Sequence, residues 1–174
     1  MRSTALMSIA SLIVFGTYTA SSDVARAATL TGKLTGVQYL IGTWSCVTKA
    51  SLPPQTQTGQ YRFWMEPGNV IGNYYRAKSY SGSGYIGWMP SERRWWSNSA
   101  GRFGGISYET GEGSATNVQL LTGSTWFQGQ PSPSRDTITK NSGTSFRDVF
   151  EMKTNAKWSV VADSSCTKTS NKAI

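Results

Sequence analysis

Apolar and polar residues alternate over short distances along most of this chain, and helical periodicity is scarce. Runs rich in Tyr, Trp, Phe, Val, Ile and Thr are broken by Gly, Pro, Asn and Ser at intervals of roughly 8 to 12 residues, which is typical of an all-β sandwich or barrel. Residues 29–39 precede the first run and are compatible with one short helical turn. We expect strands over residues 41–49, 59–66, 69–78, 84–89, 93–98, 102–108, 115–121, 124–128, 135–140, 145–152 and 156–167.

Two proline-containing stretches are predicted to be loops. Residues 50–58 carry adjacent prolines, and residues 128–134 carry two more. Proline has no backbone N–H to donate to a sheet, so both stretches are expected to separate strands. One or two neighbouring strands are expected to merge, which leaves roughly eight to ten.

The stretch Glu66-Pro67-Gly68-Asn69 is expected to form a hairpin turn with Pro and Gly at its two central positions. A loop of two residues would place Tyr61 opposite Tyr74. The more apolar face of this hairpin is assigned to the interior, with Arg76 as its one polar member. A bulge would reverse this assignment, because side chains alternate between faces. The residues predicted to face inward are Tyr61, Phe63, Met65, Val70, Gly72, Tyr74 and Arg76.

The N-terminal residues resemble an export signal. Arg2 supplies a positive charge, residues 5–15 are mostly apolar, and Ala25-Arg26-Ala27 fits the small-x-small pattern of signal peptidase sites. The apolar run is shorter than the roughly 20 residues needed to span a bilayer. We therefore expect residues 1–27 to be a cleaved signal peptide and residues 28–174 to form a single domain that is secreted or periplasmic, without stable membrane insertion.

Two features of the composition restrict the chemistry. The chain has no His, which excludes His-ligated haem or zinc and every His-dependent nucleophile. Its two cysteines, Cys46 and Cys166, would lie in an oxidising compartment after export, where a disulfide is favoured over two free thiols. We expect no metal and no cofactor.

The charged residues give no clear site. Lys and Arg number 17 against nine Asp and Glu, a net charge of +8, but no basic block typical of a nucleic-acid partner is present. Glu109 and Glu112 are interpreted as part of an exposed turn. Asp136, Asp148 and Glu151 lie among basic residues and are interpreted as solvated ion pairs. No pair of carboxylates indicates catalysis, so no catalytic residue is assigned.

The segment Gly42-Thr43-Trp44, at the start of the first strand and after the possible helical turn, resembles the calycin superfamily of lipocalin-like β-barrels. In the middle of the chain, Tyr85-Ile-Gly-Trp88, Arg94-Trp95-Trp96 and Thr125-Trp126-Phe-Gln-Gly129 are similar to segments of uncharacterised bacterial secreted calycin-like proteins. The resemblance implies an antiparallel up-and-down barrel. It also implies that the tryptophan closes the barrel floor under a basic side chain from the last strand.

The last strand supplies that side chain in one specific register. The first and last strands of an even-stranded up-and-down barrel are antiparallel neighbours. If Cys46 faces Cys166, then Trp44 faces Lys168 on the same side of the sheet. The same register would thus provide both a disulfide and a cation over an aromatic ring. These four residues are expected to be structural.

Three hypotheses for function follow. The first is an exported carrier or scavenger of a small apolar or amphipathic ligand. The second is a solid barrel that acts through its surface, as an inhibitor or an interaction module for an unspecified protein partner, with Arg93, Arg94, Trp95 and Trp96 as the contact patch. The third is a cofactor-free isomerase or cyclase. The residues predicted to contact the ligand under the first hypothesis are Tyr61, Phe63, Tyr74, Arg76, Trp88 and Trp126.

Overall fold

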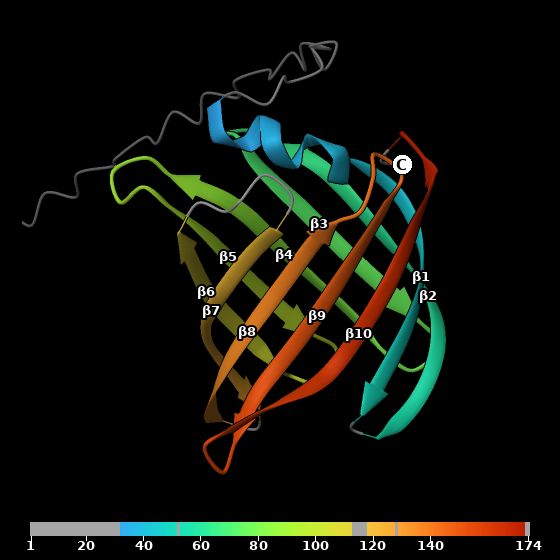
Figure 1. Ribbon diagram of the computed structural model, residues 1–174, viewed down its shortest axis with the longest axis vertical. Coiled ribbons are helices and arrows are strands. Elements are labelled where there is room, and N and C mark those ends of the chain that lie inside the picture. The colour runs from blue at the N-terminus through green and yellow to red at the C-terminus, as the bar shows by residue number, and fades with distance from the viewer. Residues whose placement is uncertain (1–31, 52, 113–117, 128, 173–174) are drawn as a thin grey trace, which may run out of the picture.

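The computed structural model describes residues 32–51, 53–112, 118–127 and 129–172. These residues form ten antiparallel strands in one closed barrel, each strand pairing with its sequence neighbours and β1 pairing with β10 (Figure 1). The predicted up-and-down barrel is therefore confirmed. The 3₁₀ helix η1 is Gly32–Leu40. The strands are β1 Gly42–Ser51, β2 Pro54–Glu66, β3 Val70–Ala77, β4 Ser81–Met89, β5 Arg94–Gly101, β6 Ile106–Glu112, β7 Val118–Phe127, β8 Gln130–Lys140, β9 Ser145–Thr154 and β10 Lys157–Ser170.

Helix η1 covers one end of the barrel (Figure 1). Its buried side chains are Leu34, Val37 and Leu40, which are three residues apart. A 3₁₀ helix has three residues per turn, so this spacing places all three on one face, against the barrel interior. The short helical turn expected before the first strand is thus confirmed. No helix within the described residues is long and apolar enough to cross a membrane.

Both predicted proline loops lie largely within strands, and Pro54, Pro131 and Pro133 take strand positions that have a neighbouring strand on one side only. Pro54 is the first residue of β2 and pairs with Ser51 of β1, whereas pairing of β2 with β3 begins only at Gly59. Pro131 and Pro133 pair with β7 and precede the first β8–β9 pair, Ser134 with Met152. A proline is tolerated at such positions because the missing N–H removes no bond on the unpaired side.

The β2–β3 hairpin also differs from its prediction. Its loop has three residues, Pro67 to Asn69, because Glu66 pairs with Val70. Gly68 and Asn69 both adopt positive φ, at 85° and 64°. The extra residue moves the register by one, so Tyr61 pairs with Tyr75 rather than Tyr74. The interior residues of β3 are therefore Ile71, Asn73, Tyr75 and Ala77, and the predicted inward orientation of Val70, Gly72, Tyr74 and Arg76 is wrong.

Glycines on the outer wall make room for large rings. Trp64 pairs with Gly72, and Trp96 pairs with Gly87. In both cases a Cβ on the glycine would overlap the indole ring of the partner. Each tryptophan thus lies flat over a neighbouring strand, which shields backbone that glycine leaves bare.

The barrel interior has two zones. Near η1 it is apolar and closed, with the fully buried side chains Leu34, Leu40, Trp44, Ile71, Leu121 and Phe146. Further from η1, the inward positions carry hydroxyls, amides, carboxyls and small residues, including the buried Thr48, Ser107, Glu109, Ser134 and Ser164. A small barrel filled only for stability would have apolar side chains throughout.

Candidate functional site in the barrel interior

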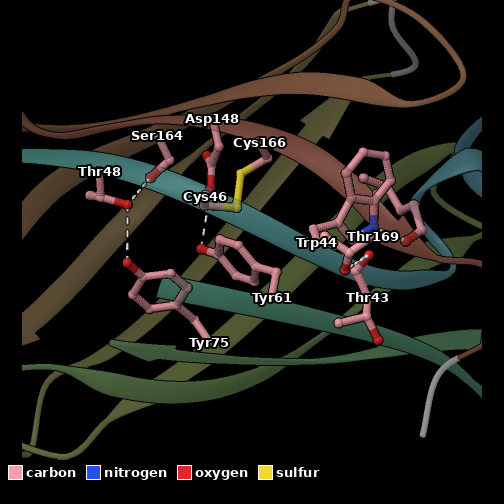
Figure 2. Close-up of a disulfide and its surroundings, with 11 residues drawn as sticks. Thr43, Trp44, Cys46, Thr48, Tyr61, Tyr75, Asp148, Ser164, Cys166 and Thr169 are labelled. Carbon is pink, nitrogen blue, oxygen red and sulfur yellow. Dashed lines mark hydrogen bonds between the residues drawn. A yellow bond between two sulfur atoms is a disulfide. The ribbon is translucent and has the colours of Figure 1, made fainter. Parts of the chain in front are cut away.

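The predicted disulfide links β1 to β10 next to the apolar zone (Figure 2). We call the pairing of these two strands the seam. Cys46 is bonded to Cys166, and Trp44 pairs with Lys168 in the same register. The Lys168 ammonium lies 4.9 Å from the centre of the Trp44 ring. It also donates a hydrogen bond to the Ile41 carbonyl at 2.9 Å, while Trp44 Nε1 donates to the Leu40 carbonyl at 2.7 Å. The expected pairing of these four residues is confirmed.

Glycine is required at the start of this seam. Gly42 has a φ of 130°, and a Cβ there would overlap the carbonyl oxygen of Ser170. The strand can begin directly beneath η1 only because this residue has no side chain. The Gly-x-Trp pattern therefore has a local physical basis: the glycine permits the close approach and the tryptophan fills the space below the helix.

Aromatic rings link the closed zone to the polar one. Tyr61 stacks on Phe63 with 5.3 Å between ring centres and lies 4.6 Å from Tyr75. Phe63 also meets the edge of Phe146 at 6.1 Å. Tyr61 and Phe63 are thus interior residues, as expected. Phe63 is only 4% exposed, whereas Tyr61 retains more exposed surface and carries its hydroxyl into the polar zone.

The other four residues predicted to contact a ligand are not gathered with Tyr61. Trp88 lies in the closed zone, edge-on to Trp95 at 5.4 Å. Trp126 is 39% exposed on the outer wall, where it pairs with Ile106. Tyr74 and Arg76 also lie on the outer wall, because the adjacent Tyr75 points inward.

The predicted surface patch is divided between the two faces of the barrel wall. Trp95 is 4% exposed and belongs to the core, whereas Trp96 lies outside over Gly87. Arg93 is a turn residue with a φ of 55°, and Arg94 forms an ion pair with Glu92 at 3.6 Å. Adjacent strand residues point to opposite faces, so only one of the two tryptophans lies outside, and the structure assigns that position to Trp96.

Three carboxyl groups point into the polar zone, and we call Glu109, Asp136 and Asp148 the interior carboxyl cluster. Glu109 is 2% exposed and accepts a hydrogen bond from Ser134 Oγ at 2.6 Å. Asp148 accepts a hydrogen bond from the Tyr61 hydroxyl at 3.2 Å (Figure 2). Asp136 pairs with Leu121, which is fully buried. The three residues come from β6, β8 and β9 and lie within their strands.

The sequence interpretation of these carboxyls is therefore wrong. Glu109 was assigned to an exposed turn, but β6 extends to Glu112 and alternation turns Glu109 inward. Asp136 and Asp148 were assigned to solvated ion pairs. Only Glu151 fits that expectation, since it pairs with Arg135 at 2.6 Å on the outer wall. Alternation within 135–140 and 145–152 offered a signal, because Ile138 and Phe146 share faces with Asp136 and Asp148.

Burial changes the protonation of the whole cluster. It raises the pKa of Glu109 from 4.5 to about 7, opposed in part by the Ser134 hydrogen bond. Burial also raises the pKa of Asp136 well above its usual range, and the nearby Asp148 charge and a hydrogen bond to Asp148 add to the shift. The pKa of Asp148 is raised by burial but lowered by hydrogen bonds from Asp136 and Tyr61. The two aspartates therefore titrate as a coupled pair, and both carboxyl groups have pKa values above the usual range.

Several interior polar atoms are left with free bonding capacity. Apart from the contact between the two aspartates, Asp136 Oδ1, Asp148 Oδ1, Thr125 Oγ1 and both amide atoms of Gln119 are buried without a hydrogen-bond partner in the described part of the chain. Buried polar groups are almost always paired, so a group of exceptions on three adjacent strands indicates a site. Asp136 and Asp148 also retain some exposed surface despite pointing inward. The interior is therefore not completely filled around them.

This arrangement can do two kinds of chemistry. Acceptor oxygens without partners can bind a cation or a hydrogen-bond donor on a ligand. A carboxyl with a pKa of about 7 can also exchange a proton near neutrality, as acid–base groups in enzymes do. The described residues contain no group of three or more His, Cys, Asp or Glu side chains placed to hold a metal ion.

Comparison with known proteins identifies the fold without a family. No protein-family model matches the sequence, and no curated protein matches it significantly. Among solved structures, "Crystal Structure of Rv2717c from M. tuberculosis" is similar with a TM-score of 0.64 and 14% identity, over 80% of this chain and 99% of that one.

Two further structures match less closely. "Structure of EF1p2_mFAP2b bound to DFHBI" has a TM-score of 0.39 and 13% identity, over 79% of this chain and 99% of that one. "Structure of a redesigned beta barrel, b11L5F_LGL" has a TM-score of 0.38 and 14% identity, over 80% and 98%. At such identities the similarity to Rv2717c extends to the β-barrel fold alone, and the two weaker matches add nothing to it.

Proposed function

We propose that this protein is an exported barrel that binds a small amphipathic molecule whose polar end is a cation or a hydrogen-bond donor. The observation that carries the proposal is the interior carboxyl cluster, which presents unpartnered acceptor atoms next to a wall of aromatic rings. The apolar part of the ligand lies against Tyr61 and Phe63. Its polar end lies at Asp148, where the Tyr61 hydroxyl already marks the boundary between the two zones.

The acidic side chains of the barrel interior favour a ligand with an amine over a ligand with a carboxylate. The arginines in the described ion pairs, Arg94, Arg135 and Arg147, are paired with Glu92, Glu151 and Asp163 rather than with the interior carboxyls. An entering ammonium group would favour the ionised form of Asp148 and would offset the burial penalty that raises its pKa. A fatty carboxylate would disfavour that ionised form.

Export is part of the proposal. Its support is the Cys46–Cys166 disulfide, which is typical of oxidising compartments, together with the signal-like N-terminus. Residues 1–27 lie outside the described residues. The proposal places the mature barrel in the periplasm or outside the cell and assigns it to the calycin-like barrels in architecture and role. The intact mass of the exported protein measures cleavage before Ala28 directly.

The test compares three ligands that share one alkyl chain: dodecylamine, dodecanol and dodecanoate, each titrated calorimetrically below its micelle concentration at pH 7.5. We expect affinity to fall in that order, with at least about a tenfold difference between amine and carboxylate. Asp148→Asn should abolish the preference for the amine while leaving dodecanol binding nearly unchanged. Asp163→Asn removes a carboxyl from the outer wall and serves as the matched control.

The outcomes separate the parts of the proposal. Equal binding of amine and carboxylate would remove the role of the carboxyl cluster but leave a carrier of apolar chains. If none of the three ligands binds, the carrier proposal fails. The second candidate, a barrel acting through its surface, would then gain weight. The feature that favours it is a set of exposed apolar side chains on the outer wall: Tyr85, Ile106, Tyr108 and Trp126.

A further inference from the structure

A hollow of about 750 Å³ lies on the outside of the barrel wall, across β1 to β4. Ser45, Gln60 and Tyr74 contribute to it, and each alternates along its strand with an inward residue, so their side chains point away from the interior. We call this hollow the outer basic groove. Its lining residues are Ser45, Thr58, Gly59, Gln60, Tyr74, Arg76, Ala77, Lys78, Ser81 and Arg102.

The groove lining carries positive charge only. Arg76, Lys78 and Arg102 line it, and the lining includes no Asp or Glu. Within the described residues Arg76 and Lys78 make no ion pair, and the Arg102 guanidinium lies over the Phe103 ring at 5.3 Å. On another part of the wall, by contrast, Arg135 and Arg147 are neutralised by Glu151 and Asp163. Three cations gathered without a counter-charge favour an anion.

Residues with neutral hydrogen-bond donors line the groove together with the three cations. Ser45, Thr58, Tyr74 and Ser81 place hydroxyl groups in the lining. Gln60 uses its Oε1 to accept a hydrogen bond from Arg62 Nε at 3.1 Å, so its NH₂ group remains to donate. Guanidinium groups combined with hydroxyls match the several acceptor oxygens of a tetrahedral anion.

We propose that the outer basic groove binds a phosphate or sulfate monoester, a dianion whose oxygens meet Arg76, Lys78 and Arg102 together. This site is separate from the barrel interior, since the wall formed by β1 to β4 stands between them. Tyr74 and Arg76, which the sequence placed in the interior, are ligand residues of this groove. A monocarboxylate would leave most of the three charges unbalanced, so the monoester dianion is the preferred class.

The groove is tested with glycerol 3-phosphate in solution and with phosphatidic acid in phosphatidylcholine vesicles. The two probes present the same phosphate monoester from different sources. Glycerol and pure phosphatidylcholine vesicles are the neutral controls. Binding is measured by calorimetry and by vesicle sedimentation in about 0.15 M salt, where unspecific attraction between exposed charges is screened beyond about 8 Å.

The variant Arg76→Gln/Lys78→Gln is compared with Lys153→Gln/Lys157→Gln, which removes the same charge at β9 and β10 on another part of the wall. We expect the groove variant to weaken binding at least about tenfold and the control to change it less than about twofold. Both variants should keep the thermal stability of the parent within a few degrees, because exposed polar substitutions rarely matter more.

Each outcome decides the proposal. Binding of glycerol 3-phosphate assigns the groove to a free metabolite-like anion, and binding of phosphatidic acid vesicles alone assigns it to a lipid headgroup. Equal losses in the two double variants would mean attraction by net charge and would overturn the proposal. So would the absence of saturable binding to both probes.

Discussion

The two zones of the barrel interior satisfy their polar groups in opposite ways. Near η1, the Trp44 indole N–H and the Lys168 ammonium each donate to a backbone carbonyl, and both residues lie against buried apolar side chains. In the polar zone, Asp136 and Asp148 keep acceptor atoms without partners and have raised pKa values. Unpaired buried carboxyls destabilise a fold, so they indicate binding or chemistry rather than packing.

The two zones also differ in the kind of interaction that holds them together. The closed zone ties the first and last strands together through the Cys46–Cys166 bond. The polar zone is held mainly by hydrogen bonds between side chains, such as Thr48 with Tyr75 at 3.0 Å and with Ser164 at 2.9 Å (Figure 2). Hydroxyl groups can rotate to new partners, so this zone can adjust to a ligand without moving the seam.

The largest predicted effect concerns the closed zone. Replacing both cysteines, Cys46→Ala/Cys166→Ala, should lower the free energy of unfolding by about 4–5 kcal/mol, because the bond closes a loop with a sequence separation of 120 residues. Urea unfolding of the parent and the variant measures this. A loss below about 1 kcal/mol would show that Trp44 and Lys168 hold the seam without the bridge.

The next effect concerns the polar zone and pH. Glu109 ionises at about 7 in the folded protein instead of at 4.5, so between these values the folded state binds more protons than the unfolded state. Stability should therefore fall by about 3 kcal/mol as pH rises from 4.5 to 7. Asp136, whose pKa is also raised, adds to the fall with the same sign.

Chemical unfolding at pH 5 and pH 8 measures that dependence. Glu109→Gln should remove the part of the difference that Glu109 contributes and leave the part from Asp136, and it should make the protein more stable than the parent at pH 8, since the neutral amide can still accept from Ser134. Glu112→Gln, an exposed position on the same strand, is the matched control and should keep the parental difference. An unchanged difference in Glu109→Gln would mean that Glu109 does not ionise in this range.

The smallest effect returns to the closed zone. Lys168→Met keeps the length of the side chain but removes the cation over Trp44 and the hydrogen bond to Ile41, and it should lower stability by about 1–2 kcal/mol. Lys168→Arg retains both interactions in kind and should recover most of the loss. Equal losses in both variants would indicate a packing role for the aliphatic stem instead. Neither change should alter the pH dependence assigned to Glu109.

The seam between β1 and β10 in the closed zone could be predicted from the sequence alone. Strand alternation, the Gly42-Thr43-Trp44 segment and two cysteines were enough to predict a barrel, its first and last strands as neighbours, and Trp44 opposite Lys168. These features can be predicted because a single register between β1 and β10 sets both the cysteine pair and the Trp44–Lys168 pair. The fold of a β-barrel depends on a local pattern with a period of two, which survives errors of a residue or two at strand ends.

Which side chains meet inside the barrel depends on the three-dimensional fold. A three-residue loop instead of a two-residue loop turned Tyr74 and Arg76 from the interior to the outer wall, because one added residue reverses every later side chain in the pairing. Glu109, Asp136 and Asp148 come from three different strands, and their raised pKa values arise mainly from burial that closure of the barrel creates. Alternation places Asp136 and Asp148 on the same faces as Ile138 and Phe146, but no local pattern shows that the three carboxyls meet or that burial raises their pKa values.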